Sequence, residues 1–345
     1  MKSKNILIFA YTGIGDAVML IPIILTLKRN FPDSCIFIVT DNKYGSGDVL
    51  SSHANCIYND IPNIKFDFII NPKFGGISLI KLIGLYFKRI YFREKFITHF
   101  VFKSKFSNII FRYILTFLRI KTYDFKFSIH QVINNLSLLT FFNFTENKLI
   151  LNPAFANNHI LKLSNEMKQK FNLPDRFVTI QVGAANNTLT PKRWPIQNWL
   201  FLITEISKNF KIILVGDKNE ESNDFNKFEG VLNLIGKTNI SDLMGILANS
   251  SVVIGSDSGI THLSSSLSKN TLVLWGPTAF AVSRQIGVNT QFVSLNLPCS
   301  PCTSGSFLKS EKEAYLTCQY NVKCMHELQP KYVYNEFLKI WNKYE

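Results

Sequence analysis

Short apolar runs alternate with segments of helical periodicity in the first half of the chain. Apolar residues at 6–10 are followed by a glycine-containing turn at 11–16, a helical pattern over 17–30 and a second apolar run at 35–40. This succession predicts a strand, a helix and a second strand. A third strand is expected at 66–70.

The alternation resumes beyond residue 156, and there each predicted strand ends at a glycine. The strands are expected at 177–182, 211–215, 251–254 and 271–275, and the residues that follow them are Gly183, Gly216, Gly255 and Gly276. The carboxyl ends of such strands form the edge at which open α/β sheets bind ligands. The pattern therefore predicts an α/β protein with a binding edge in its second half.

The length of the chain fits two domains. At 345 residues it is longer than one ordinary hydrophobic core supports. Asn-Pro and small residues around 151–156 mark the boundary. We expect an N-terminal Rossmann-like domain at 1–155, a C-terminal Rossmann-like domain at 156–328, and a final helix at 329–345 that packs back on the N-terminal domain.

Positive charge is concentrated in one segment. The formal net charge is +14, and between Lys81 and Lys126 eleven Lys or Arg residues stand against two acidic ones, which is +9 of that total. Fourteen aromatic residues lie between Tyr86 and Phe127. We expect segment 79–127 to form one or two amphipathic helices whose aromatic and basic side chains meet an anionic membrane surface. Nucleic-acid binding uses the same residue types, and a buried helical pair is a third interpretation.

The turn after the first strand places a carboxylate at the start of a helix. Gly13 and Gly15 allow the backbone to turn sharply before Asp16. Residue 18 is valine, so the turn lacks the third glycine of the dinucleotide-binding fingerprint. An aspartate here is either a helix cap or a general base that takes a proton from an attacking hydroxyl.

Two loops of the second half carry groups suited to an anion. Loop 183–195 combines small residues and hydroxyls with Lys192 and Arg193, which suit a diphosphate that gains charge as it leaves. Loop 255–262 opens a helix whose free N–H groups and dipole attract phosphate or sugar oxygens. The alternative for loop 183–195 is a basic loop that is merely solvated, and the alternative for His262 is a structural role.

These motifs recur together in one known family. They are Gly-Ile-Gly-Asp at 13–16, Lys-Arg-Trp-Pro at 192–195, and Gly-Ser-Asp-Ser-Gly-Ile-Thr-His at 255–262 followed by Leu-Trp-Gly-Pro-Thr at 274–278. The combination resembles glycosyltransferase family 9, the ADP-heptose lipopolysaccharide heptosyltransferases and their relatives. The resemblance covers nearly the whole chain. It implies a GT-B fold with two Rossmann-like domains facing each other across a cleft, and an inverting, metal-independent reaction.

The resemblance also implies roles for individual residues. Asp16, in the acceptor-side turn with Gly13 and Gly15, is the expected base. The residues expected to bind the donor are Thr188, Lys192, Glu220, Asp257, Ser258, Gly259 and His262, with Glu220 placed at the donor ribose. The sequence departs from the family at 216–218, where many members have Gly-Gly-Pro, and at 134–135, where Asn-Asn replaces the usual Asp-Arg. The second departure predicts altered recognition of the acceptor or of the donor sugar.

Four of the six cysteines cluster near the C-terminus. They are Cys299, Cys302, Cys318 and Cys324, in a C-x2-C-x15-C-x5-C arrangement. This spacing fits four thiolates around a structural zinc. Reduced structural thiols and disulfides are the alternatives, and a cytosolic setting disfavours the disulfides.

The leading hypothesis is transfer of a sugar, a heptose from ADP-heptose, to a lipopolysaccharide-core or related lipid-linked acceptor. The apolar run at the N-terminus is too short for a signal peptide, and no stretch has the length of a membrane span. We therefore expect a cytoplasmic protein, peripheral at the inner face of the bacterial cytoplasmic membrane, with no nucleic-acid partner. A sugar-nucleotide epimerase and a non-enzymatic membrane or nucleic-acid adaptor are the alternatives.

Overall fold

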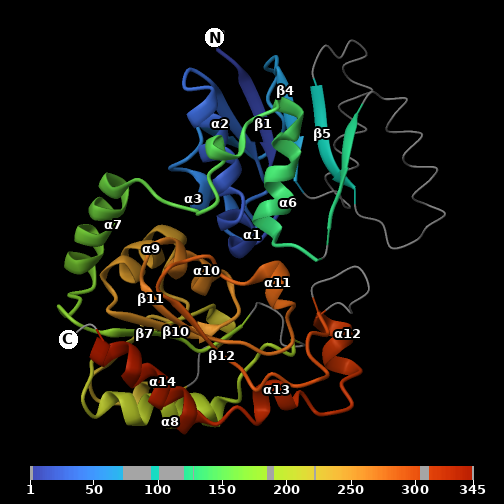
Figure 1. The fold of residues 1–345 in the computed structure, drawn as a ribbon. Coiled ribbons are helices and arrows are strands. Elements are labelled where there is room, and N and C mark those ends of the chain that lie inside the picture. Colours follow the sequence, from blue (N-terminus) through green and yellow to red (C-terminus); the bar gives the residue numbers. More distant parts are fainter. Residues whose placement is uncertain are drawn as a thin grey trace. The chain divides into compact units, whose positions relative to one another are not determined.

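The computed structural model folds into two compact units, Met1–Ala154 and Phe155–Glu345 (Figure 1). The structure describes residues 3–72, 95–100, 120–126, 128–184, 190–220, 223–303 and 311–343. Each unit contains a six-stranded parallel sheet. In both sheets the strands follow the order that is typical of a Rossmann fold, in which the chain winds outward in both directions from a central strand.

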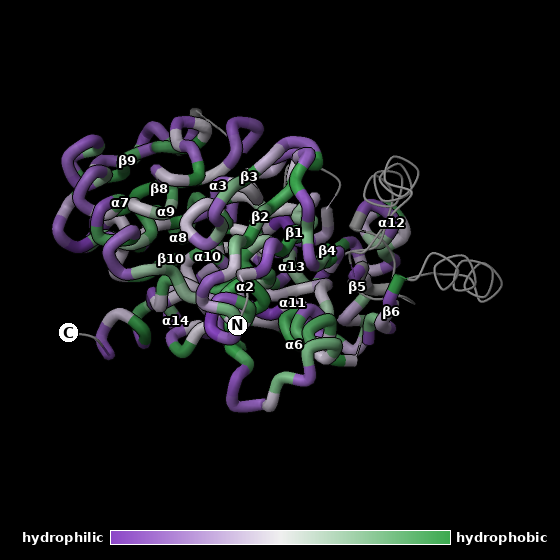
Figure 2. Tube along the Cα trace, turned by 90° about the horizontal axis from the view of Figure 1, so that it is seen from above, coloured by the Kyte–Doolittle hydropathy of each residue, from purple (hydrophilic) through white to green (hydrophobic). Residues whose placement is uncertain are grey.

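The first sheet has the order β3-β2-β1-β4-β5-β6. Its strands are β1 (Asn5–Phe9), β2 (Cys35–Val39), β3 (Cys56–Tyr58), β4 (Phe68–Asn71), β5 (Lys95–Phe100) and β6 (Lys121–Asp124). On the central strand, Leu7 lies opposite Phe37 on one side and Ile69 on the other. The tube of β1 runs through hydrophobic colours, whereas the surrounding turns are mostly hydrophilic (Figure 2). Burial on both faces accounts for the continuous apolar runs seen in the sequence.

The helix expected over 17–30 is two helices, α1 (Ile14–Val18) and α2 (Ile21–Asn30). Pro22 occupies the first turn of α2 and has no N–H with which to continue the ladder from α1. Helix α3 (Ser46–Leu50) and helix α6 (Gln131–Ser137) complete the regular helices described in this unit, with 3₁₀ turns at Leu138–Phe142 and Glu146–Lys148.

Two strands lie within the basic aromatic segment 79–127, for which only helices were expected. They are β5 and β6, which extend the sheet beyond β4. The edge strand β6 reads Lys-Thr-Tyr-Asp, a sequence without an apolar run, and it was missed for that reason. Most of the remaining segment, including the expected amphipathic helices, lies outside the described residues.

The second sheet has the order β12-β11-β10-β7-β8-β9. Its strands are β7 (Val178–Gln181), β8 (Ile212–Val215), β9 (Val231–Asn233), β10 (Val252–Ser256), β11 (Asn270–Leu274) and β12 (Thr290–Val293). The helices are α7 (Asn157–Lys170), α8 (Ile196–Ser207), α9 (Ile240–Asn249), α10 (Gly259–Ser266), α11 (Phe280–Ser283), α12 (Glu311–Leu316), α13 (Lys323–His326) and α14 (Pro330–Lys343), with 3₁₀ turns at Lys218–Glu220 and Asn223–Lys227. Figure 1 shows α8 and α14 on one face of this sheet and α9 and α10 on the other.

The last helix belongs to the second unit. Within that unit α14 packs against α8, and its expected contact with the first unit stays a prediction. Its buried residues Val333, Phe337, Ile340 and Trp341 are part of the core that α8 and the strands form. Among the described helices, none has both the length and the apolar character that crossing a membrane requires.

Candidate functional site

Asp16 is held by hydrogen bonds from two parts of the first unit. It lies in α1, directly after the turn that follows β1, and is half-buried. The Thr12 hydroxyl donates to its Oδ2 at 2.6 Å, and the Gln131 side-chain amide donates to its Oδ1 at 3.0 Å. Both carboxylate oxygens are therefore oriented, one by the local turn and one by the first residue of α6.

The two asparagines that replace the family's Asp-Arg pair have structural partners. Asn134 and Asn135 are each 1% exposed. The Asn134 side chain accepts from the backbone N–H of Lys126 and donates to its carbonyl, both at 2.8 Å. Asn135 donates to the carbonyl of Met19 at 2.9 Å. These bonds tie α6 to the segment before it and to the end of α1, so both amides fasten the backbone that carries Gln131.

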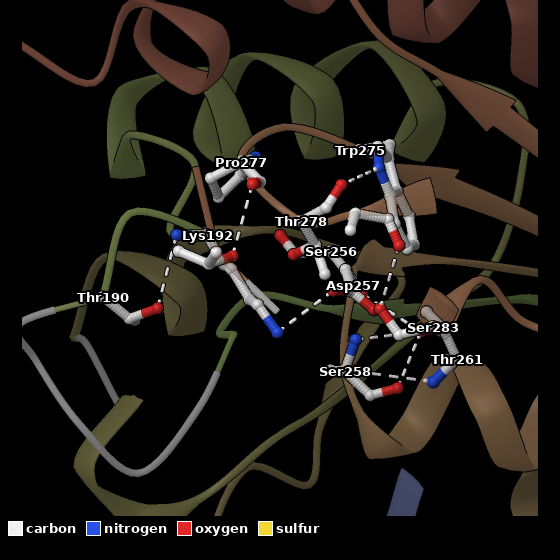
Figure 3. Close-up of polar contacts among 12 residues, drawn as sticks. Thr190, Lys192, Ser256, Asp257, Ser258, Thr261, Trp275, Pro277, Thr278 and Ser283 are labelled. Atoms are coloured by element: carbon white, nitrogen blue, oxygen red, sulfur yellow. Dashed lines mark hydrogen bonds and ion pairs between the residues drawn. The ribbon is translucent and has the colours of Figure 1, made fainter. Parts of the chain in front are cut away.

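In the second unit, a buried ion pair joins the loop after β7 to the end of β10. Lys192 Nζ lies 3.0 Å from Asp257 Oδ2, and the two side chains are 15% and 5% exposed (Figure 3). The backbone N–H of Lys192 is fixed in turn by the Thr190 hydroxyl at 3.3 Å. The expected site residues Lys192 and Asp257 thus meet at the carboxyl edge of the sheet.

The surroundings of Asp257 keep it charged despite its burial. Burial alone would raise the pKa of Asp257, but the charges of Lys192 and His262 and the hydrogen bonds from Thr278 and Lys192 together outweigh it, and the pKa lies below its usual value. Asp257 Oδ1 accepts a hydrogen bond from the Gln285 side-chain amide at 3.1 Å.

Helix α10 begins at this carboxylate with a capping box. Ser258 accepts from the N–H of Thr261, and Thr261 accepts from the N–H of Ser258. Ser258 also donates to the Gln181 side chain at the end of β7, at 2.6 Å. Among the described residues, the N–H groups of Gly259 and Ile260 have no hydrogen-bond partner. The first turn therefore retains two donors that can meet an anion.

Gly255 lies inside β10 rather than after it, as the sequence had suggested. A Cβ there would lie 2.8 Å from the Gln181 side chain and 3.0 Å from the Thr261 methyl group. Glycine at this position lets α10 and the end of β7 approach the strand closely. It therefore serves the packing between the strand, Gln181 and Thr261.

Glu220 is folded into a space that two glycines leave open. It lies in the 3₁₀ turn after β8, its side chain is 4% exposed, and its Oε1 is 3.8 Å from Arg193 Nη2. A Cβ on Gly183 would fall 1.4 Å from that Oε1, and one on Gly216 would fall 2.5 Å from Oε2. Burial raises the pKa of Glu220 above its usual value, although Arg193 and the N–H of Asp217 oppose the shift.

The structure gathers six of the seven expected donor residues at the carboxyl edge of the second sheet or in the first turns of α10. These are Lys192, Glu220, Asp257, Ser258, Gly259 and His262. Thr188 lies outside the described residues. Asp16, Gly13 and Gly15 lie in the first unit.

Sequence reasoning missed the glutamines that support these residues. Gln131, Gln181 and Gln285 each make a side-chain hydrogen bond to an expected site residue. Glutamine carries no charge and matches no short motif, so the only available signal was the position of Gln181 as the last residue of an apolar strand.

The four C-terminal cysteines are close enough to influence one another. All four are free thiols. Burial and the neighbouring Cys302, Cys299 and Cys318 raise the pKa of Cys324 to about 12. Within the described residues, no group of three or more His, Cys, Asp or Glu side chains is arranged to hold a metal ion. Cys318 and Cys324 pack against the hydrophobic core of the second unit, whereas Cys299 is exposed.

Comparison with known proteins identifies the family. The family profile described as glycosyltransferase family 9 (heptosyltransferase) matches residues 110–311, which is more than half of the chain. The chain belongs to glycosyltransferase family 9. It is a glycosyltransferase, and its two Rossmann-like units are those of a GT-B fold.

Individual relatives agree with this assignment. The chain is 28% identical to lipooligosaccharide heptosyltransferase 2 of Campylobacter jejuni over 349 aligned positions, which cover 95% of this chain and 96% of the relative. A glycosyltransferase of family 9 from Veillonella parvula superposes with a TM-score of 0.73 at 15% identity, covering 99% of this chain and 98% of that one. The E. coli heptosyltransferase WaaC, solved with ADP, gives 0.63 at 16% identity, with 92% and 99% covered.

Proposed function

We propose that this protein is an inverting glycosyltransferase that moves a heptose from ADP-heptose to a lipopolysaccharide-core or related glycolipid. The observation that carries the proposal is the carboxyl edge of the second sheet, where Lys192 pairs with Asp257 and where the first turn of α10, two residues further on, retains two N–H groups without hydrogen-bond partners among the described residues. The C. jejuni relative bears the name of a lipooligosaccharide heptosyltransferase, and WaaC was solved with ADP. The name of the first relative supports a lipid-linked acceptor, and the ADP bound to the second supports a nucleotide-sugar donor.

In this proposal Asp16 is the general base. It takes the proton of the acceptor hydroxyl, whose oxygen forms a bond to the anomeric carbon of the donor while the bond to the diphosphate breaks. Thr12 and Gln131 hold the carboxylate in one orientation, and fixed orientation lowers the entropic cost of the transfer.

The donor diphosphate gains negative charge as it leaves. Lys192 and the first turn of α10 offer a cation and backbone dipoles to that charge. His262 lies within the same helix, and Glu220 is expected to accept hydrogen bonds from the donor ribose hydroxyls. Thr188 is proposed as a further donor contact.

The basic aromatic segment 79–127 is proposed to bring the protein to the anionic inner face of the membrane, where a lipid-linked acceptor lies. The support for this step is the charge and aromatic content of the sequence. Association with this inner face would make it a peripheral membrane protein on the cytoplasmic side.

The test is a donor screen followed by product analysis. Purified protein is tested against ADP- and UDP-sugars by thermal shift, and the stabilising donor is then incubated with a lipid-A-core acceptor. Mass spectrometry should show the acceptor enlarged by one heptose residue, and nuclear magnetic resonance should show inversion at the anomeric carbon. A modified donor without an enlarged acceptor would overturn the proposal in favour of an epimerase.

A further inference from the structure

Gln285 is buried beside the anion site without being part of any expected motif. It follows α11, in the connection between β11 and β12, and is 2% exposed. Its amide nitrogen lies 3.1 Å from Asp257 Oδ1 and 2.9 Å from the hydroxyl of Thr261. A carboxylate only accepts hydrogen bonds, so the nitrogen and not the oxygen of the amide must face Asp257.

Gln285 and Lys192 divide the two oxygens of Asp257 between them. Lys192 pairs with Oδ2 at 3.0 Å, and Gln285 donates to Oδ1. A carboxylate bonded at one oxygen can rotate about its last torsion, whereas one bonded at both is fixed in its plane. Together with the Thr278 side chain, the amide therefore helps to set the direction in which Asp257 presents Oδ2 to the Lys192 ammonium.

A glutamine at this position has a cost. The carbonyl oxygen of the Gln285 side chain is buried and has no hydrogen-bond partner among the described residues. Leaving such an acceptor unsatisfied is unfavourable, and an apolar side chain of the same shape would avoid the penalty. The amide nitrogen must therefore supply something that an apolar residue would not.

Donor binding would increase the demand on this bond. In the proposed function the diphosphate competes with Asp257 for the Lys192 ammonium. As that ion pair weakens, the buried carboxylate depends more on its remaining partners, which are the Gln285 amide, the Thr278 side chain and the charge of His262. Gln285 also bonds Thr261, so the same amide ties Asp257 to the first turn of α10, which carries the free N–H groups.

We propose that Gln285 is a positioning residue that holds Asp257 so that Lys192 and the first turn of α10 are aligned to bind the donor diphosphate. The inference rests on the proposed function, because it concerns the site where the donor is expected. It assigns no contact between Gln285 and the donor.

The test compares a ligand that has the diphosphate with one that lacks it. Affinities for ADP and for adenosine are measured by isothermal titration calorimetry for the natural protein and for Gln285→Met, which keeps the length of the side chain but removes the amide. A hydrogen bond to a charged group is worth enough to predict a loss of about tenfold or more in ADP affinity. Adenosine affinity should stay within about twofold.

Two further variants serve as a conservative replacement and as a control. Gln285→Asn keeps the amide but withdraws it by one methylene, so it should show the same selective loss with less effect on folding. Gln291→Met replaces an exposed glutamine of β12 and should change neither affinity.

The possible results distinguish a failure of the proposed role of Gln285 from a failure of the proposed diphosphate site. If Gln285→Met and Gln285→Asn weaken ADP and adenosine by the same factor, or weaken neither, Gln285 has no positioning role and the inference is overturned. If the natural protein binds ADP no better than adenosine, the proposed diphosphate site is itself wrong, and the inference fails with it.

Discussion

Replacing Lys192 by glutamine would leave the buried carboxylate of Asp257 without its ion-pair partner. The two charges lie 3.0 Å apart, with side chains that are 15% and 5% exposed. At an effective dielectric constant of about 20, such charges attract by about 5.5 kcal/mol. Gln285 and His262 still stabilise the carboxylate in the variant. We therefore expect a loss near the lower end of the range for breaking a buried pair, about 3 kcal/mol in the free energy of unfolding at pH 7.

The loss should depend on pH in a direction that the pKa of Asp257 decides. In the natural protein this pKa is lowered, so the pair stabilises the fold above the unfolded-state pKa and the contribution is lost as the pH falls through the folded value. Without Lys192, burial dominates and the pKa of Asp257 should rise above its usual value. Protonation then removes the cost of an unpaired buried carboxylate in the variant. The difference in the free energy of unfolding between the two proteins should therefore shrink as the pH falls from 7 towards 4.

Urea unfolding followed by tryptophan fluorescence measures this effect directly. All four tryptophans, residues 194, 199, 275 and 341, lie in the second unit, so the signal reports the unit that holds the pair. Lys208→Gln removes a lysine that is 56% exposed from its pair with Glu205, and it should cost less than about 1 kcal/mol. A loss below about 1 kcal/mol for Lys192→Gln, or one that is the same at every pH, would refute the buried pair.

Two other changes test neighbouring features. Gly183→Ala places a Cβ where the Glu220 carboxylate now lies, so the carboxylate must move. Adenosine affinity should fall about tenfold, because Glu220 is the proposed partner of the ribose. The free energy of unfolding should change by less than about 1 kcal/mol, because burial of that carboxylate is already unfavourable. Calorimetry and urea unfolding check this, and unchanged adenosine binding would contradict the assignment of Glu220. Native alkylation by iodoacetamide at pH 7, followed by mass spectrometry, should modify the exposed Cys56 and Cys299 first. Cys324 should react only after unfolding, because a thiol with a pKa of about 12 stays protonated. Rapid modification of Cys324 in the folded protein would contradict this shielding.

The alternation of apolar runs with helical patterns was enough to predict the Rossmann-like fold. Strands buried on both faces, such as β1 and β10, leave continuous apolar runs that are visible in the sequence. Edge strands leave no such record, and β6 and β9 were missed because they are short and partly exposed. The single helix expected over 17–30 was wrong at residues 19–20, just before Pro22, since a pattern of apolar residues does not show where the hydrogen-bond ladder is interrupted.

The candidate site was predictable as far as its charged residues. Lys192 and Asp257 stand in loops at strand ends, and their meeting follows from the parallel order of β7 and β10. The partners that orient them were not predictable in the same way. Gln131 lies 115 residues from Asp16 in sequence, and Gln285 lies 28 residues from Asp257. Such contacts depend on how helices settle on the sheet. The backbone hydrogen bonds of Asn134 and Asn135 were not predictable either, and altered recognition at these positions stays a prediction.

The most direct test of the central claim separates binding from transfer at Asp16. Asp16→Asn keeps the shape of the side chain, and its amide oxygen can still accept the hydrogen bond from the Gln131 amide, but it removes the base. We predict that transfer of sugar to the acceptor falls by about 10²-fold or more, while donor affinity measured by calorimetry stays within about twofold, because the residues proposed to bind the donor lie in the other unit. Transfer by Asp16→Asn at a rate close to that of the natural protein would contradict the assignment of Asp16 as the base.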